Sequence, residues 1–203
     1  MKNKYEERIA RLQAKFADAG IDGLYINHVE NVSYFTGKKG NDCTLWITPT
    51  RATILTDFRY REMAQELTWL NFYETSGTAR PIDLLNACPY TKIGVERDYL
   101  PLNDYLDFTK KLEGKEILPV EGLVEDLRMV KDEEEMEFTR QAEEISARAF
   151  LHMLDYLKPG VTEREAAVVS ERRLRSFGSI TVRISAYFSI CFSLIPSART
   201  ISF

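Results

Sequence analysis

Short apolar segments alternate with helix-like segments along the first 120 residues, and this alternation restricts the chain to a few fold classes. Four of the apolar segments have the length of strands: residues 23–27 (GLYIN), 71–74 (NFYE), 92–96 (KIGVE) and 116–120 (EILPV). Segments with helical spacing or helix-capping residues lie between them. Strands that alternate with helices in this order predict a three-layer α/β domain over residues 1–120.

A strand–turn–strand signal in the middle of this region predicts that the sheet is mixed. Residues 43–48 (CTLWIT) and 52–56 (ATILT) flank the turn residues 49–51 (PTR). Two strands joined by so short a turn pair antiparallel, whereas the helical crossovers elsewhere favour parallel pairs. The next helix is expected over residues 57–67 (DFRYREMAQEL), with Asp57 as its capping residue.

A long amphipathic helix with its own start signal follows residue 131 and marks a second structural unit. Asp132 and Glu135 have the spacing of a capping box, and apolar residues then recur every three or four positions as far as Tyr156. Residues 158–160 (KPG) end this helix, and Thr162 with Glu165 opens another that ends near residue 178. We therefore divide the chain into an α/β domain (1–120), a connector (121–131), two helices (132–178) and a divergent tail (179–203).

The tail has an unusual composition. After residue 178 it contains no Asp, Glu, His or Lys, although charged residues make up 29% of the whole chain. Its uncharged run between Arg183 and Arg199 is shorter than the ~20 apolar residues that a membrane-spanning helix requires, so no membrane partner is expected. Apolar residues at 180, 182, 184 and 186 alternate as in a half-buried strand.

The charge distribution and the cysteines exclude several classes of protein. The formal net charge is −4 and the basic residues are scattered, so no nucleic-acid partner is expected. The first ten residues are too charged for a secretory signal. Cys43, Cys88 and Cys191 are odd in number and far apart, which is typical of reduced thiols in a cytoplasmic protein.

The sequence carries no recognisable motif for metal, phosphate or nucleophilic chemistry. Glu133, Glu134 and Glu135 are successive on a helix, so their side chains point in different directions and are interpreted as a solvated helix start. His28 and His152 are the only histidines, and neither has an Asp or Glu at a ligand spacing. The residues alone therefore identify no catalytic, cofactor-binding or metal-binding side chain.

Four stretches in order nevertheless resemble one family. They are residues 31–37 (NVSYFTG), 55–64 (LTDFRYREMA), 127–145 (LRMVKDEEEMEFTRQAEEI) and 157–165 (LKPGVTERE). Together they are similar to successive segments of the creatinase/aminopeptidase P/prolidase family, and the similarity extends from about Tyr5 to Gly178. The resemblance implies an N-terminal α/β domain, a connector and the first two helices of a "pita-bread" catalytic domain.

The resemblance also implies a chemistry. Full-length relatives use two divalent metal ions, of manganese or cobalt type, to activate the water that attacks the peptide bond before proline. Their ligands (two Asp, one His and two Glu) follow the second helix of the catalytic domain, where this chain departs from the family pattern. The departure indicates a changed reading frame or a truncated gene, and the alternative is that the tail is a natural strand segment. We therefore expect a truncated Xaa-Pro peptidase-like protein that lacks the metal ligands and is inactive alone. The alternatives are a non-catalytic peptide-binding or subunit-pairing module, and a creatinase-type lineage with small non-peptide substrates.

Partners and site residues follow from the resemblance only. Proline-containing peptides and a homo-oligomer are implied, because the N-terminal domain of such proteins can lean over the active site of a neighbouring subunit. In that arrangement Asp57 and Arg59 of the TDFRY motif would lie at the substrate edge, with Arg59 meeting a substrate carboxylate. The alternative is that Asp57 caps the following helix and Arg59 lies on its surface.

Overall fold

The computed structural model describes residues 3–38 and 42–178, and these form two compact units. Unit 1 is Met1–Val130 and unit 2 is Lys131–Phe203, and each is described by itself. The expected strand at residues 180–186, like the rest of the predicted tail, lies outside the described residues. The other predicted domain boundaries stay predictions.

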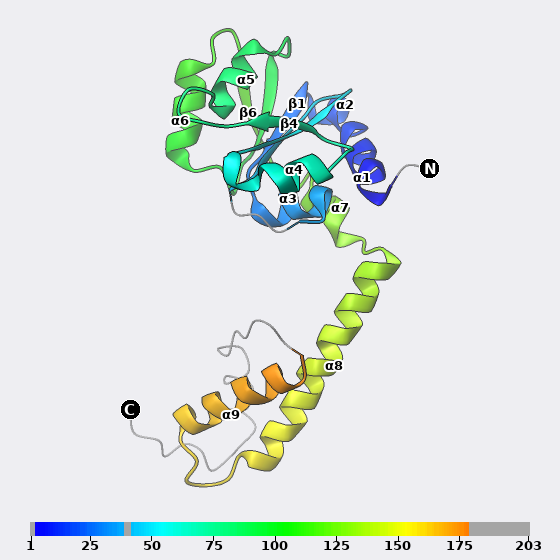
Figure 1. Cartoon of the computed structure of the whole chain (residues 1–203), viewed down its shortest axis with the longest axis vertical. Helices are drawn as coiled ribbons and strands as arrows, with labels where there is room; N and C mark the ends of the chain where they lie inside the picture. Colours follow the sequence, from blue (N-terminus) through cyan, green and yellow to red (C-terminus); the bar gives the residue numbers. More distant parts are fainter. Residues whose placement is uncertain (1–2, 39–41, 179–203) are drawn as a thin grey trace. The chain divides into compact units, whose positions relative to one another are not determined.

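Unit 1 is built on a six-stranded mixed sheet (Figure 1). Its strands are β1 Gly23–Ile26, β2 Thr44–Ile47, β3 Ala52–Thr56, β4 Asn71–Glu74, β5 Lys92–Glu96 and β6 Glu116–Val120, in the order β4-β3-β2-β1-β5-β6. The pairs β1–β2 and β2–β3 are antiparallel, and the other three pairs are parallel. The turn at residues 49–51 joins β2 to β3, so the predicted mixed sheet is confirmed. Pro119 lies in β6, one of the two outer strands of the described sheet.

Helices cover both faces of this sheet and give it three layers. In chain order the helices of unit 1 are α1 Lys4–Gln13, α2 Phe16–Ala19, α3 Val29–Thr36, the 3₁₀ turn η1 Phe58–Tyr60, α4 Arg61–Glu66, α5 Pro81–Ala87, α6 Leu102–Lys111 and α7 Glu125–Met129. One apolar core lies between the sheet and α1–α4, and a second lies between the sheet and helices α5 and α6. The predicted three-layer α/β domain is therefore confirmed.

Alternation along the strands divides these two cores. In β1, Leu24 and Ile26 point into the first core, while Tyr25 points into the second. In β2, Trp46 joins Tyr25 in the second core. Successive side chains of a strand point to opposite faces, so strands apolar at every position must be covered on both sides. Each Leu or Ile buried in this way contributes about 1.5–3 kcal/mol to folding.

The helix predicted at residues 57–67 differs from the prediction in one respect. It is broken into η1 and α4, and the break lies at Tyr60, whose φ of −108° and ψ of 11° are not helical. Asp57 does cap the segment, since its side chain accepts a hydrogen bond from the backbone N–H of Arg59. This bond spans only two residues, which is compatible with the tighter 3₁₀ turn that follows.

Two glycines end helices in the same left-handed conformation but in different surroundings. Gly20 follows α2 with φ 67°, and Gly37 follows α3 with φ 69°. A Cβ atom built on Gly20 would meet nothing within 4 Å. A Cβ atom on Gly37 would lie 2.2 Å from the hydroxyl oxygen of Tyr5, whose ring stacks on Trp69 with centroids 5.1 Å apart.

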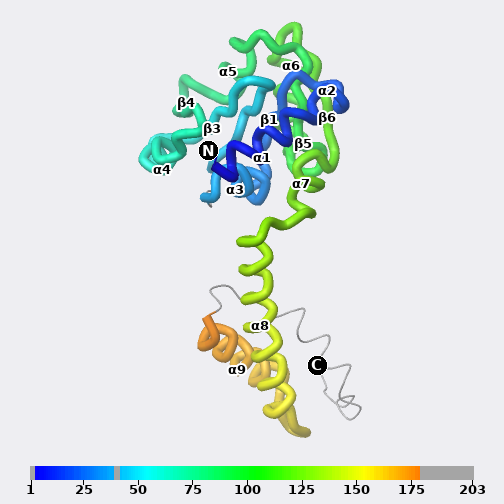
Figure 2. Tube along the Cα trace, turned by 90° about the vertical axis from the view of Figure 1, so that its right-hand side faces the viewer, coloured from blue at the N-terminus to red at the C-terminus, as the bar shows by residue number. Residues whose placement is uncertain are grey.

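Unit 2 contains two helices, α8 Glu133–Tyr156 and α9 Glu163–Ser176, among its described residues. Both predicted capping boxes are present, Asp132 with Glu135 and Thr162 with Glu165. The two helices pack against each other (Figure 2), and Ala149 and Met153 of α8 are buried. Within the part of the chain that the structure describes, no helix has the length and hydropathy needed to cross a membrane.

Candidate functional site

The two residues predicted for the substrate edge lie directly after β3. Asp57 has extended backbone geometry, with φ −88° and ψ 179°, and its carboxylate turns back over the first turn of η1. The preceding strand residue, Thr56, is buried and donates a hydrogen bond of 3.0 Å from Oγ1 to the carbonyl oxygen of Asp42. The end of β3 therefore holds the backbone of Asp42 close to Asp57.

Arg59 joins these two carboxylates. Its Nε lies 3.1 Å and 2.9 Å from the two carboxylate oxygens of Asp57, and its Nη2 lies 2.7 Å from Asp57 Oδ2. The same Nη2 donates to Asp42 Oδ2 at 2.9 Å. The hydrogen bond from Arg59 lowers the pKa of Asp57, and the pKa of Arg59 is raised in turn. Solvent screening keeps the contribution of such an exposed ion pair to stability small.

The charge of this cluster limits what it can bind. Two carboxylates surround one guanidinium, so the ionised cluster of Asp42, Asp57 and Arg59 has one excess negative charge. A ligand carboxylate can reach Arg59 only by displacing a carboxylate, and Asp42 is the more exposed one, at 51% against 27% for Asp57. Phe58 is 69% exposed beside the cluster and offers an apolar surface. Because both carboxylates pair with Arg59, the arrangement suits the binding of a ligand.

A second polar cluster, which the sequence analysis did not identify, is buried in unit 1. Glu96 at the end of β5 is 5% exposed and accepts hydrogen bonds of 2.7 Å from the backbone N–H groups of Asn27 and His28. Asn31, which is fully buried, donates to Glu96 at 2.6 Å. The only available signal was position: Asn31 opens the NVSYFTG motif and Glu96 ends a predicted strand. The hydrogen bond between these two side chains could not be predicted from the sequence, since 65 residues separate them.

The structure does not bring the two histidines together. The ring of His28 stacks on Tyr99 with centroids 3.5 Å apart, and its Nε2 lies 2.8 Å from a carboxylate oxygen of Glu30. His152 lies on α8 in unit 2 and accepts a hydrogen bond of 2.7 Å from Arg173 on α9. Each histidine therefore has a local structural partner.

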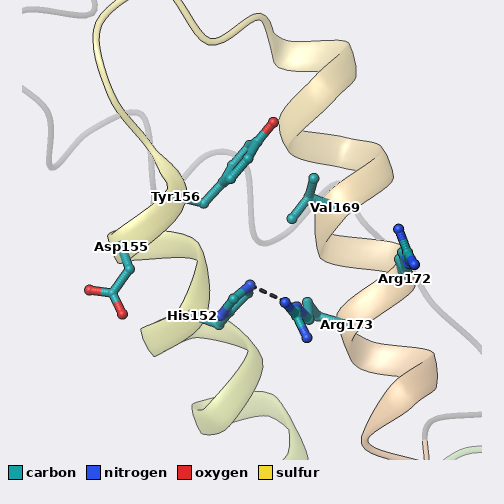
Figure 3. Close-up of a pocket in the computed structure, with 6 residues that line it drawn as sticks. All are labelled: His152, Asp155, Tyr156, Val169, Arg172 and Arg173. Carbon is teal, nitrogen blue, oxygen red and sulfur yellow. Dashed lines mark hydrogen bonds between the residues drawn. The ribbon is translucent and has the colours of Figure 1, made fainter.

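An open recess of about 450 Å³ lies between α8 and α9 in unit 2. Figure 3 shows Tyr156 and His152 reaching from α8 toward α9, while the carboxylate of Asp155 points away from α9. Arg172 and Arg173 line the opposite wall. Arg173 is engaged by His152, whereas Arg172 has no hydrogen-bond or ion-pair partner among the described residues. The recess thus presents one uncompensated guanidinium.

The described residues provide no converging set of ligands for a metal ion. Within residues 3–38 and 42–178, no three His, Cys, Asp or Glu side chains come together in a way that could hold a metal ion. The acidic run at the start of α8 serves the helix instead, with Glu135 closing the capping box on Asp132. The described residues therefore do not fit the two divalent ions that the resemblance implies.

Comparison with known proteins establishes the family. Residues 8–130 match the model of the creatinase/prolidase N-terminal domain. The chain belongs to this family. The resemblance inferred from the four sequence motifs is thereby confirmed, and unit 1 carries the matching segment.

Relatives extend the match beyond the first unit. The chain is 30% identical over 175 residues to the uncharacterized peptidase YqhT of Bacillus subtilis, covering 85% of this chain and 50% of that protein. A solved Xaa-Pro dipeptidase from Bacillus anthracis has a TM-score of 0.81 at 29% identity, covering 88% of this chain and 51% of that one. The chain thus spans about half the length of the relatives that it matches.

A third similarity concerns a shorter solved protein. An aminopeptidase P (Xaa-Pro aminopeptidase) chain from Streptococcus thermophilus has a TM-score of 0.56 at 25% identity. The match covers 62% of this chain and 99% of that one. The match therefore takes in nearly the whole of the solved chain but less than two thirds of this one.

Proposed function

We propose that this chain is the amino-terminal, substrate-edge part of an Xaa-Pro peptidase, and that peptide hydrolysis requires metal ligands outside residues 3–38 and 42–178. The cluster of Asp42, Asp57 and Arg59 carries the proposal, because it presents a guanidinium at the exposed end of β3. The similarity to proteins named Xaa-Pro dipeptidase supports proline-containing peptides as the proposed substrate class.

The chemistry of the cluster suits one end of such a peptide. A guanidinium fork can bind a carboxylate through two parallel hydrogen bonds. Arg59 would exchange Asp42 for the carboxylate of the peptide and keep its contacts with Asp57, while exposed Phe58 packs against apolar substrate atoms. Metal ions of manganese or cobalt type would supply the activated water in full-length relatives. The described residues do not fit these ions.

The first test of the proposal measures hydrolysis. The purified chain is incubated with Ala-Pro and manganese or cobalt, and proline release is followed. No metal-dependent release is expected, because the described residues provide no converging ligand set. Release of proline that depends on the metal would overturn the inactive-alone part of the proposal.

The second test measures binding of Ala-Pro by NMR titration. The affinity is expected to be weak, of order millimolar or about −4 kcal/mol in total, because the binding surface is exposed. Arg59→Ala is expected to weaken it at least several-fold. Arg61→Ala is the matched control, because Arg61 is 50% exposed against 55% for Arg59 and pairs with Glu74 instead. Equal affinities for the two variants would refute the role of Arg59.

The recess between α8 and α9 favours the second candidate, a non-catalytic peptide-binding module. Arg172 would take the carboxyl end of a peptide there, since no described group neutralises it. In the same NMR titration, Arg172→Ala would abolish the chemical-shift changes that Ala-Pro causes, while Arg59→Ala would leave these changes as they are in the wild-type chain. That result would favour the peptide-binding module over the substrate-edge role.

Oligomeric state and location complete the proposal. Unit 2 exposes large apolar side chains, of which Phe138, Leu151 and Val168 are each more than 60% exposed. A homo-oligomer would cover such residues, and a monomer by light scattering at high concentration would contradict it. The free thiols of Cys43 and Cys88 support a cytoplasmic location.

A further inference from the structure

A hydrogen bond between the two helices of unit 2 requires a neutral histidine. Nε of Arg173 on α9 lies 2.7 Å from Nε2 of His152 on α8 and donates to it. A guanidinium has donors and no acceptor, so Nε2 of His152 must be the acceptor and carries no proton. The contact therefore exists only while the imidazole is neutral.

Both side chains line the open recess of about 450 Å³ between α8 and α9 (Figure 3). Arg172 precedes Arg173 on α9 and lines the same recess, with no hydrogen-bond or ion-pair partner among the described residues. The recess therefore holds one guanidinium that is ready to bind a ligand and a second one that is occupied by a neutral imidazole.

The charged groups around His152 leave the recess with an excess of positive charge. The charged or titratable side chains that line it are Asp155 and Tyr156 on α8 and Arg172 and Arg173 on α9. The carboxylate of Asp155 points away from α9 (Figure 3). Nearby, Arg148 of α8 lies 4.4 Å from the centroid of the Phe177 ring, and Glu171 of α9 pairs with Arg175. Thus no carboxylate that lines the recess faces the two guanidinium groups.

Protonation of His152 would change the recess in two ways. An imidazolium has no lone pair for Arg173, so this guanidinium would be released, and the imidazolium would add a positive charge of its own. Repulsion between His152, Arg172 and Arg173 disfavours this state unless an anion lies among them. Binding of an anion and uptake of a proton by His152 therefore favour each other.

We propose that the recess between α8 and α9 is an oxyanion site whose occupation is coupled to protonation of His152. Arg172 binds the oxyanion at any pH, and Arg173 and His152 join it when the imidazole is protonated. The ligand is a negatively charged group with several acceptor oxygens, either a free inorganic oxyanion or the carboxyl end of a peptide. The peptide source rests on the second candidate function, whereas the inorganic source does not.

Sulfate is the probe, because it stays a dianion over the range of about pH 5 to 8 in which imidazole changes its charge. It is titrated into the full chain at about pH 6 and at about pH 8, at constant ionic strength, and the NMR signals of α8 and α9 are followed. Binding should be about three- to tenfold tighter at the lower pH, because two exposed charge pairs are gained. Equal affinities would overturn the coupling, and unchanged signals at both pH values would overturn the site.

A histidine variant isolates the effect of the proton. In His152→Gln the amide oxygen can accept from Arg173 as the neutral imidazole does, but it does not titrate. Its affinity for sulfate should therefore be the same at both pH values and equal to the wild-type affinity at the higher pH. His28→Gln is the matched control, because His28 is the other histidine of the chain and lies in unit 1. A pH dependence that persists in His152→Gln would refute the coupling.

Two arginine variants locate the site. Arg172→Ala should weaken sulfate binding at least about fivefold at both pH values, because it removes the unpaired guanidinium. Arg164→Ala is the matched control, because Arg164 is also exposed on α9 but does not line the recess. Its affinity for sulfate should equal that of the wild-type chain. Equal affinities of the two variants would place sulfate elsewhere and overturn the site.

Ala-Pro distinguishes the two sources of the oxyanion. If the recess takes the carboxyl end of a peptide, Ala-Pro should compete with sulfate and should bind more tightly at the lower pH. Sulfate binding with the expected pH dependence but without competition would support the site with an inorganic ligand and would count against the peptide-binding module. The failure of the second candidate function is thus separable from the failure of the site.

Discussion

Replacing Gly37 by alanine should destabilise unit 1 through two separable effects. The left-handed backbone costs a residue with a Cβ atom about 1–2 kcal/mol. The new Cβ would also lie 2.2 Å from the Tyr5 hydroxyl oxygen, so the Tyr5 ring must move. Displacing it from Trp69 costs about 0.5–1.5 kcal/mol, and loss of its contact with the Arg8 guanidinium, 5.6 Å from the centroid, costs about 0.5–1 kcal/mol. The total is about 2–4.5 kcal/mol.

Gly20 supplies the matched control for this experiment. It has nearly the same φ, 67° against 69°, and open space around its Cβ position, so Gly20→Ala should cost the backbone term alone. Urea unfolding is followed by tryptophan fluorescence, since Trp69 is one of two tryptophans. In a Tyr5→Ala background, Gly37→Ala should cost no more than Gly20→Ala. Equal costs of the two glycine variants in the wild-type background would refute the steric argument.

Two further predictions concern the second core. Burial raises the pKa of Tyr25 to about 12, so the stability that depends on its neutral phenol is complete below pH 10 and is lost as the pH rises through 12. This loss amounts to about 2–3 kcal/mol of the free energy of unfolding. The Tyr25→Phe variant should not lose this stability as the pH rises. If its stability falls with pH as in the wild-type chain, Tyr25 is not the group responsible. Leu85→Ala should cost about 2–5 kcal/mol in urea unfolding, because Leu85 is fully buried. Leu106→Ala, at a side chain 54% exposed, should cost less than about 0.5 kcal/mol, and similar costs for both would count against the described packing.

Local signals were sufficient for most of the fold. The strands at residues 71–74, 92–96 and 116–120 have the predicted bounds, and the prediction for β1 extends one residue too far. Runs of four or five residues have the usual length of a strand and are too short for a typical helix, which explains this agreement. The turn at residues 49–51 correctly predicted that β2 and β3 pair antiparallel. The two capping boxes correctly predicted where α8 and α9 begin.

Long-range polar contacts could not be predicted in the same way. Asn31 and Glu125 are 94 residues apart, and Arg59 and Asp42 are 17 residues apart. No periodic pattern relates such positions, because their meeting depends on the order of the strands. Helix α7 was missed for a similar reason. Its five residues lie in the predicted connector, and contacts with the rest of unit 1 hold them.

The proline in β6 has a consequence for how the sheet meets other chains. Glu116 donates its N–H to the carbonyl of Thr91, and Val120 accepts from Arg97, so alternate residues of β6 point their backbone groups toward β5. Residues 117 and 119 therefore direct theirs away from it. Pro119 has no N–H to offer there, which removes a donor that an incoming strand would need. This margin of the sheet is consequently a poor template for edge-to-edge aggregation, and it gains that protection without losing a hydrogen bond to β5.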